Sequence, residues 1–185
     1  MTRLWLVRHG ETEWSRDGRH TSTTDLPLTE DGEETARSLA PRLGSESFAL
    51  VLSSPRQRAR RTAALAGFAE PEITEDLAEW AYGDYEGVST EEIRRTVPGW
   101  TVWSHPVPGG EAAAAVAARL DRVVARVREV DGDVLVFAHG HSLRALAARW
   151  LGLDVRDGRV LRLDTATISQ LGFERESPVV LRWNG

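Results

Sequence analysis

Short apolar runs alternate along this chain with longer stretches whose apolar residues keep helical spacing. Leu4–Val7, Ala49–Leu52 and Val134–Ala138 are continuous apolar runs, a pattern typical of strands that are buried on both faces. Towards the end of the chain, Thr167–Phe173 and Val179–Trp183 predict two further strands around a turn. The hydrophobic pattern therefore predicts five strands.

Helices are predicted between these strands. Thr29 is expected to cap a helix whose apolar positions continue to Leu43, and Ser54, which is followed by proline, is expected to cap the next helix. A long helix is expected to open at Pro108–Glu111, and another to follow His139–His141. This alternation of strands and helices predicts an α/β fold with a mainly parallel sheet flanked by helices.

The segment from Leu77 to Gly110 interrupts the alternation. Its periodicity is weak and it holds several aromatic residues, glycines and prolines, so we expect a short cap insertion at about residues 77–110 with one helix over Thr90–Thr96. The aromatic residues pack this cap or line a substrate entrance, and both roles can hold at once. They are Trp80, Tyr82, Tyr85, Trp100 and Trp103. No repeat or linker divides the chain, so residues 1–185 are expected to form a single domain.

Composition narrows the classes of protein and the kinds of chemistry. Apolar residues make up 41% and charged residues 28% of the 185 positions, which is typical of a globular protein. The chain has no cysteine, and all 23 basic residues are arginine. Thiol nucleophiles, disulfides, Schiff-base lysines and P-loop lysines are therefore excluded. With a net charge of −5 and no apolar window near the roughly 18 residues of a membrane span, we expect a cytoplasmic protein with no nucleic-acid or membrane partner.

Three strand ends carry side chains that can bind or attack a phosphoryl group. Arg8 and His9 follow the first strand, Arg58 lies just beyond the second, and His139 follows the third. Because the carboxyl ends of parallel strands meet at one edge of a sheet, we expect these groups to converge. An imidazole can act as a nucleophile, and a guanidinium can hold a phosphate through two N–H groups. The helices after the second and third strands begin at the same edge, where free N–H groups would favour an anion.

A histidine behind a strand is more often structural than catalytic, so the tetrapeptide Arg8–Glu11 does not decide the chemistry by itself. Five motifs in order carry more weight, because in them the chain resembles the histidine phosphatase superfamily, also called the phosphoglycerate mutase-like family. The motifs are Leu6–Thr12, Asp25–Thr29 with Gly32, Ser53–Pro55 with Arg58 and Thr62, Glu79 with Gly83 and Glu86, and His139 with Gly140. The resemblance implies a three-layer α/β sandwich around a mainly parallel sheet.

The resemblance also implies a role for each motif. His9 would be the nucleophile and form a phosphohistidine, while Glu79 would protonate the leaving alkoxide and then take a proton from water. The phosphoryl oxygens would be held by Arg8, Arg58, His139 and the Gly140 backbone. The second ring nitrogen of His9 must bind an acceptor, for which we expect a backbone carbonyl, so that the attacking nitrogen keeps its lone pair. No metal and no cofactor is implied, because arginines and imidazoles can neutralise a phosphoryl group.

Several residues near the first motif are weaker candidates for the site. Ser15 stands where many relatives have an asparagine that touches phosphate, and its hydroxyl can still donate one hydrogen bond. Thr21 and Ser22 replace a stretch that often contains glycine, and their hydroxyls either contact the substrate or belong to a solvated loop. His20 and His105 either line the mouth of the site or lie on surface loops. The sequence leaves these alternatives open.

Two other assignments concern acids and metals. Asp76, Asp84 and Glu86 are alternatives to Glu79 as the catalytic acid, because all four lie in one segment. His141 completes a His-x-His pair of the kind that can bind a metal, but such a pair requires acidic partners that the sequence does not provide at a recognisable spacing. We therefore expect no metal site.

The length of the insertion bears on the reaction. Mutases of the family are typically longer, with an extended insertion, further basic residues for the substrate carboxylate and a C-terminal tail that closes the site. Here the insertion is short and the chain stops soon after Trp183, so an open site favours hydrolysis. We expect a metal-independent, acid phosphatase-like phosphomonoesterase that acts on a small organic phosphate ester and works best at mildly acidic pH. Phosphoglycerate mutase is the alternative, followed by a non-catalytic phosphate-binding protein; substrate identity and oligomeric state are not determined by the sequence.

Overall fold

Six strands form one mixed sheet in the computed structural model, which describes residues 2–185. The strands are β1 (Leu4–Arg8), β2 (Phe48–Ser53), β3 (Glu72–Ile73), β4 (Asp133–Ala138), β5 (Ile168–Glu174) and β6 (Ser177–Arg182). They lie in the order β3-β2-β4-β1-β5-β6. The pairs β1–β4, β2–β4 and β2–β3 are parallel. In contrast, β5 runs antiparallel to β1, and β6 runs antiparallel to β5. The predicted α/β fold with a mainly parallel sheet is confirmed.

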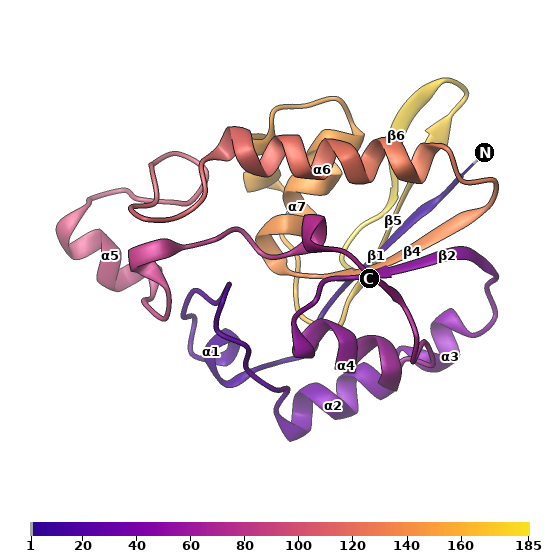
Figure 1. The fold of residues 1–185 in the computed structure, drawn as a ribbon, viewed down its shortest axis with the longest axis horizontal. Helices are drawn as coiled ribbons and strands as arrows, with labels where there is room; N and C mark the ends of the chain where they lie inside the picture. The colour runs from indigo at the N-terminus through magenta and orange to yellow at the C-terminus, as the bar shows by residue number, and fades with distance from the viewer. Residues whose placement is uncertain (1) are drawn as a thin grey trace.

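Helices cover both faces of this sheet. The α-helices are α1 (Glu13–Arg16), α2 (Glu30–Arg37), α3 (Ala40–Leu43), α4 (Gln57–Leu65), α5 (Thr90–Thr96), α6 (Ala113–Arg128) and α7 (Gly140–Trp150). The 3-10 helices are η1 (Glu75–Leu77), η2 (Gly83–Tyr85) and η3 (Val155–Val160). In Figure 1, α6 and α7 lie on one face of the sheet, α2, α3 and α4 lie on the other, and α5 lies beyond the ends of the strands. This arrangement is the predicted three-layer sandwich.

Alternate side chains of the central strands enter two different cores. On β4, Val134 and Val136 are buried together with residues of α6 and α7, whereas Leu135 and Phe137 are buried together with residues of α3 and α4. Because helices cover both faces of this strand, its sequence is a continuous apolar run rather than an alternation of apolar and polar residues. Within residues 2–185, no helix combines the length and the apolar character that crossing a membrane requires.

The cap insertion shares the larger core with the body of the molecule. Trp80 and Trp100 are each 1% exposed, Trp103 is 6% exposed, and all three belong to the same cluster as the apolar residues of α6 and α7. The helix over Thr90–Thr96 is found as predicted, and the hydroxyl of Ser89 accepts a hydrogen bond at its start. The interpretation that these aromatic residues pack the cap is confirmed.

Two predicted helices differ from the structure at their ends. The first one stops at Arg37, and the chain resumes as α3 with Pro41 in its first turn. A proline inside a helix lacks the N–H for the helical hydrogen bond and clashes with the preceding turn, so one continuous helix cannot pass through Pro41. The second helix begins at Gln57 rather than directly after Ser54, and the Ser54 hydroxyl lies 2.7 Å from Nε2 of His139 instead of capping it.

The remaining differences are smaller. The long helix α6 begins at Ala113 and not at Pro108–Glu111, because the chain there makes a turn in which the N–H of Gly110 donates to the Val107 carbonyl at 3.0 Å. The short elements α1 and β3, of four and two residues, were not predicted. The last hairpin turn, predicted over Glu174–Pro178, is tighter, because β5 ends at Glu174 and β6 begins at Ser177. Within it, Arg175 has a φ of 55°.

Candidate active site

The strands that carry the predicted site residues end at one edge of the sheet. Arg8, the last residue of β1, is paired with Ala138, the last residue of β4, so His9 and His139 leave the sheet side by side. The N–H of His9 donates to the Ala138 carbonyl at 3.0 Å, and the centroids of the two imidazoles lie 5.2 Å apart. The convergence expected from the parallel sheet is therefore present in the structure.

His9 has the orientation that a nucleophilic imidazole requires. Its Nδ1 lies 2.7 Å from the carbonyl oxygen of Gly10, and because a carbonyl only accepts, the ring proton of a neutral His9 belongs on Nδ1. Its Nε2 has no hydrogen-bond partner within residues 2–185 and keeps its lone pair. Burial, and after it the charges of Arg58 and Arg8, hold the pKa of His9 well below the usual range of histidine. His9 is therefore a neutral imidazole at neutral pH.

The backbone behind His9 is held by a close contact between two glycines. A Cβ atom at Gly10 would come within 2.4 Å of the carbonyl oxygen of Gly32, a distance that no side chain tolerates. The N–H of Gly10 donates to the hydroxyl of Thr62 at 3.0 Å, which in turn donates to the backbone of Arg58 at 2.7 Å. The loop after β1, which carries His9 and Gly10, is thereby fixed against both α2 and α4.

Arg8 lines a cavity beside His9, whereas Arg58 is not among the residues that line it. This cavity has a volume of about 180 Å³, and Nη1 of Arg8 donates to the Leu163 carbonyl at 2.6 Å. Arg58 is fully buried behind the loop that follows α1, and its guanidinium donates to the carbonyls of Thr24 at 3.0 Å and Thr21 at 3.2 Å. Burial lowers the pKa of both arginines from its ordinary value. Nearby negative charge is therefore favourable for each of them.

Three predicted phosphate ligands have a buried nitrogen without a partner. Within residues 2–185, three nitrogens of these residues are buried and make no hydrogen bond: Nε of Arg8, Nε of Arg58 and Nδ1 of His139. The same is true of Nε of Arg56. His139 is fully buried, and burial and then the charge of Arg58 hold its pKa well below the usual range. Unpaired buried N–H groups are unfavourable and rare in native proteins. Their concentration around His9 points to an acceptor-rich group that binds among them.

Glu79 is held at the start of α7. Its Oε1 accepts from the N–H of Ser142 at 2.7 Å and from Trp80 at 2.9 Å, and its Oε2 accepts from the N–H of His141 at 3.0 Å. Glu79 lines the cavity, so Oε2, with a single hydrogen bond, is the oxygen placed to exchange a proton with a bound group. The backbone of the helix fixes the position of this carboxylate.

The three alternative acids lie elsewhere. Asp76 forms an ion pair with Arg122, Glu86 accepts hydrogen bonds from the loop after α1, and neither of them, nor Asp84, lines the cavity. Hydrogen bonds to Glu86 outweigh its burial and lower its pKa, which favours its ionised form. Of the four acids in this segment, the geometry favours Glu79.

Acidic side chains occupy part of both helix N-termini that were expected to be free for an anion. At the start of α7 the N–H groups of His141 and Ser142 donate to Glu79, and at the start of α4 the N–H of Gln57 donates to the Asp25 carboxylate at 2.8 Å. Both helices are capped by acidic side chains from distant parts of the chain. The Gly140 backbone lines the cavity, and a Cβ atom there would lie 3.3 Å from Cζ of Arg8, so glycine allows the guanidinium to pack against it.

The weaker candidates for phosphate binding are divided by the structure. Ser15 and Thr21 line the cavity, whereas Ser22 does not. The hydroxyl of Ser15 donates to the Thr12 carbonyl at 3.0 Å in the capping box of α1, and that of Thr21 donates to a backbone carbonyl at 3.2 Å. The hydroxyl of Ser22 donates to the Glu86 carboxylate, so it serves to hold the loop.

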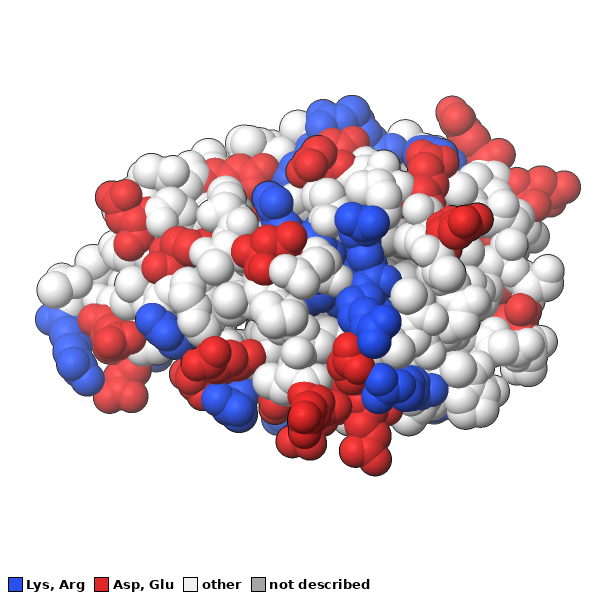
Figure 2. Space-filling view, turned by 60° about the horizontal axis from the view of Figure 1, so that its bottom comes forward, with Lys and Arg blue, Asp and Glu red and all other residues white. Residues whose placement is uncertain are grey.

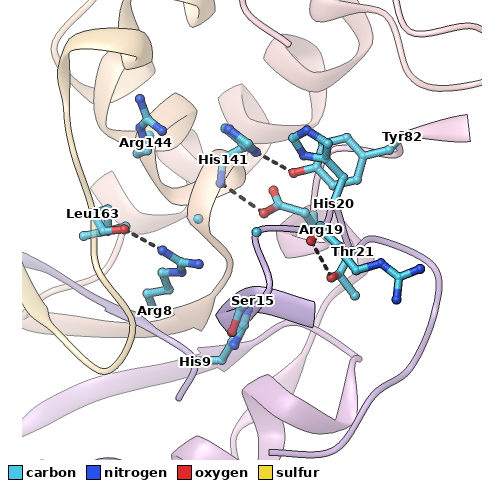
Figure 3. A pocket seen from close by; sticks show the side chains of 13 residues that line it. Arg8, His9, Ser15, Arg19, His20, Thr21, Tyr82, His141, Arg144 and Leu163 are labelled. Carbon is cyan, nitrogen blue, oxygen red and sulfur yellow. Dashed lines mark hydrogen bonds between the residues drawn. The ribbon is translucent and has the colours of Figure 1, made fainter. Parts of the chain in front are cut away.

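The cavity also contains residues to which the sequence assigns no definite role. His20 lines this cavity, while His105 lines a separate one beside Trp103. The opposite wall from His9 in Figure 3 carries Tyr82, His141 and Arg144. Arg144 follows His141 by three residues on α7, so helical spacing beside a known motif was the signal that could have identified it.

Charged side chains and possible metal ligands are distributed differently in the structure. Although the net charge is −5, Figure 2 shows basic side chains gathered in a band across the middle of one face, with acidic side chains around it. Within residues 2–185, no three His, Asp or Glu side chains are grouped closely enough to hold a metal ion. The His-x-His pair is used differently, because Nε2 of His139 faces Ser54 and Nδ1 of His141 faces Tyr82.

Comparison with known proteins identifies the family of this chain. The sequence profile of the histidine phosphatase superfamily (branch 1) matches residues 4–185. An acid phosphatase from Mycobacterium tuberculosis is 44% identical over 176 residues, which cover 93% of this chain and 87% of that protein. A sedoheptulose 1,7-bisphosphatase from Saccharomyces cerevisiae is 37% identical over 187 residues, which cover 83% of this chain and 69% of that protein.

A solved structure has the same fold as this chain. The crystal structure of an open reading frame from Mycobacterium tuberculosis matches this fold with a TM-score of 0.95 and 41% identity, covering 99% of this chain and 97% of the other. The match of the profile runs through β1, α4, the cap insertion and α7, which are the elements that position the site. The protein is a phosphatase, and the chain belongs to the histidine phosphatase superfamily (branch 1).

Proposed function

We propose that this phosphatase is a metal-independent phosphomonoesterase that hydrolyses a small organic phosphate through a phosphohistidine on His9. The observation that carries the proposal is the free Nε2 of His9 beside three buried nitrogens without partners, on Arg8, Arg58 and His139. Phosphoryl oxygens would supply the acceptors that the arginine N–H groups lack, and that Nδ1 of His139 lacks in the tautomer that carries its proton there. The arginines would supply the positive charge that phosphoryl transfer requires.

The reaction would proceed in two in-line steps. In the first, Nε2 of His9 attacks phosphorus, the bond from phosphorus to the ester oxygen breaks, and Oε2 of Glu79 donates a proton to the leaving alkoxide. In the second, Glu79 takes a proton from water, the resulting hydroxide attacks phosphorus, and the phosphorus–nitrogen bond breaks to release inorganic phosphate. The hydrogen bond from Nδ1 to Gly10 keeps the ring oriented through both steps.

Arg8, the Gly140 N–H, Arg58 and His139 form the proposed phosphoryl-binding set. Ser15 and Thr21 stand at the cavity wall and complete it only if their hydroxyl protons turn from backbone carbonyls to the phosphate. Since Ser22 is engaged with Glu86, we assign it to the support of the loop.

The pH dependence follows from His9. Burial and the neighbouring guanidinium groups keep its pKa low, so the neutral nucleophile persists at mildly acidic pH, where the substrate can carry the proton that the leaving group needs. We expect kcat/KM to be greatest at mildly acidic pH. A kcat/KM that rises steadily above neutrality would contradict this assignment.

The first experiment is phosphate release from p-nitrophenyl phosphate in EDTA by wild type and His9→Ala. Wild-type turnover that is lost in His9→Ala supports the proposal, and His105→Ala, which removes a histidine outside this cavity, should retain turnover. Acid-quenched labelled enzyme should carry phosphate on His9. Turnover by His9→Ala at the wild-type rate would overturn the proposal.

Phosphoglycerate mutase activity is the second candidate. The observation that favours it is Arg144 in the cavity wall, since a mutase needs a basic group for the substrate carboxylate. Interconversion of the two monophosphoglycerates by an enzyme that releases no phosphate would favour the mutase. Phosphate binding without either reaction would indicate a binding protein.

A further inference from the structure

The wall of the cavity opposite His9 contains two donors from one helix. His141 and Arg144 are three residues apart on α7, so their side chains lie on the same face of the helix. Both line the cavity, and Figure 3 shows them on the far side from His9 and Ser15. Neither belongs to the phosphoryl-binding set proposed above.

Arg144 is a half-buried cation that no carboxylate neutralises. Its Nε donates to the Gly158 carbonyl at 3.1 Å, its Nη2 donates to the Arg159 carbonyl at 2.9 Å, and its guanidinium lies 4.8 Å from the centroid of the Trp103 ring. Within residues 2–185 it forms no ion pair with Asp or Glu. Burial lowers its pKa, and the charge of Glu79 offsets only part of this effect. The side chain is thus fixed in place while Nη1 remains available.

His141 also faces the cavity as a donor. Its Nδ1 lies 2.5 Å from the hydroxyl of Tyr82. Burial raises the pKa of Tyr82 well above its usual range, and burial together with the charge of Arg144 holds the pKa of His141 well below its own. Tyr82 therefore keeps its proton, and in the tautomer in which its hydroxyl donates a hydrogen bond to Nδ1, the ring proton of the neutral His141 lies on Nε2.

This wall, formed by Tyr82, His141 and Arg144, offers hydrogen-bond donors and a positive charge, and none of these three side chains is negatively charged. A sugar or glycol hydroxyl could accept a hydrogen bond there, but it would leave the guanidinium without a counter-charge. A carboxylate or a phosphate satisfies both requirements, because charge-assisted hydrogen bonds to arginine are the stronger kind and are often bidentate.

We infer that Arg144, with His141 beside it, binds a second anionic group of the substrate, so that the enzyme selects phosphomonoesters that carry a carboxylate or another phosphate away from the bond that is cleaved. This inference rests on the proposed function, since it places the scissile phosphate at His9. Arg144 acts as a specificity residue and takes no part in the transfer of the phosphoryl group.

Matched substrate pairs test the inference in the wild-type enzyme. Phosphoglycolate is compared with glycol phosphate and phosphoglycerate with glycerol phosphate, which differ only by carboxylate in place of a hydroxymethyl group; propanediol bisphosphate is compared with propanediol monophosphate. We expect kcat/KM to be about 10- to 100-fold higher for the anionic member of at least one pair, the range for a charge-assisted hydrogen bond. The pair that shows the preference distinguishes a carboxylate from a second phosphate. Equal kcat/KM within every pair would overturn the inference.

Substitution of Arg144 tests whether this residue carries the preference. In Arg144→Met the ratio of kcat/KM within the preferred pair should fall to near one, and Arg144→Lys should keep part of it. Arg149→Met is the matched control, because Arg149 lies on the same helix but pairs with Asp121 outside the cavity; its ratio should equal that of the wild type. An unchanged ratio in a folded Arg144→Met would overturn the inference, and if that variant does not fold, the Lys variant and the wild-type ratio still decide it.

A binding experiment separates failure of this inference from failure of the proposed function. Phosphonoacetate and ethylphosphonate cannot be hydrolysed as esters, and calorimetry should show tighter binding of phosphonoacetate to the wild type and a loss of that difference in Arg144→Met. If p-nitrophenyl phosphate is cleaved through His9 but phosphonoacetate has no advantage, the inference alone is wrong. If no ester is cleaved yet the advantage depends on Arg144, the anion subsite stands and the proposed hydrolysis is wrong.

Discussion

The two ends of the cavity are built by different means. At the phosphoryl end, Arg8, His9 and His139 follow directly from paired strands, and Arg58 is locked by backbone carbonyls, so the geometry is set by the register of the sheet. At the far end, Arg144 and its neighbours come from a helix face and from the cap insertion, where the register sets nothing. With the roles proposed above, chemistry resides where the backbone leaves little freedom, whereas the choice of substrate resides where the chain can vary.

Glu79 lines the same cavity, and its substitution should have the largest effect of the variants that keep His9. Glu79→Gln should slow alkyl phosphates by about 10²- to 10⁴-fold, because a general acid contributes this much when the leaving group is a poor one. p-Nitrophenyl phosphate should be slowed much less, since nitrophenolate leaves without a proton. The measurement is kcat for both substrate types, with the exposed Glu75→Gln as the control. Equal losses on the two substrates would remove Glu79 from its assigned role.

Arg58 tests whether the phosphoryl end acts on every substrate alike. Arg58→Met should lower kcat/KM by about 10²- to 10³-fold, the range seen when one charge-stabilising donor is removed, for aryl and alkyl phosphates and for both members of each matched pair. Arg60→Met, at an exposed position on the same helix, should behave as wild type. A loss confined to substrates with a second anion would erase the distinction between the two ends.

His20 provides the smallest effect and concerns stability. Burial lowers its pKa from the ordinary 6.5 to about 4, so below pH 6.5 the unfolded chain binds a proton that the folded chain does not. Folding stability is therefore complete above pH 6.5 and falls with pH until about pH 4, by about 2 kcal/mol at pH 5 for this one residue. Urea unfolding at pH 7 and pH 5 should show a smaller loss in His20→Phe than in wild type. The same loss in both proteins would contradict the assignment.

The parts of the site that the sequence predicted are those that depend on strands. His9 and His139 were placed correctly relative to each other because parallel pairing brings strand ends together whatever the intervening chain does. The bond from His9 to a backbone carbonyl was expected on chemical grounds and is present at Gly10. Local pattern and elementary chemistry were sufficient at these positions.

The parts that the sequence did not predict depend on contacts between distant segments. No local signal shows that Glu86 accepts a hydrogen bond from Ser22, 64 residues away. Nor does one show that Glu79 accepts hydrogen bonds from two N–H groups at the start of α7. Arg144 had no acidic neighbour in the sequence to suggest a role, and only the fold reveals that it lines the cavity and forms no ion pair within residues 2–185. Such pairings require the three-dimensional arrangement before they can be stated.

The shared core of the cap insertion limits how substrates reach His9. Trp80 and Trp100 are almost fully buried with the body of the molecule, and side chains of this size bury about 150–250 Å² each. At about 25 cal/mol per Å², lifting the two away from the core would require about 8–12 kcal/mol, comparable to the stability of an entire small protein. Displacing Trp80 and Trp100 is therefore too costly to serve as a gate, so substrates should reach His9 without a step that lifts these two side chains from the core.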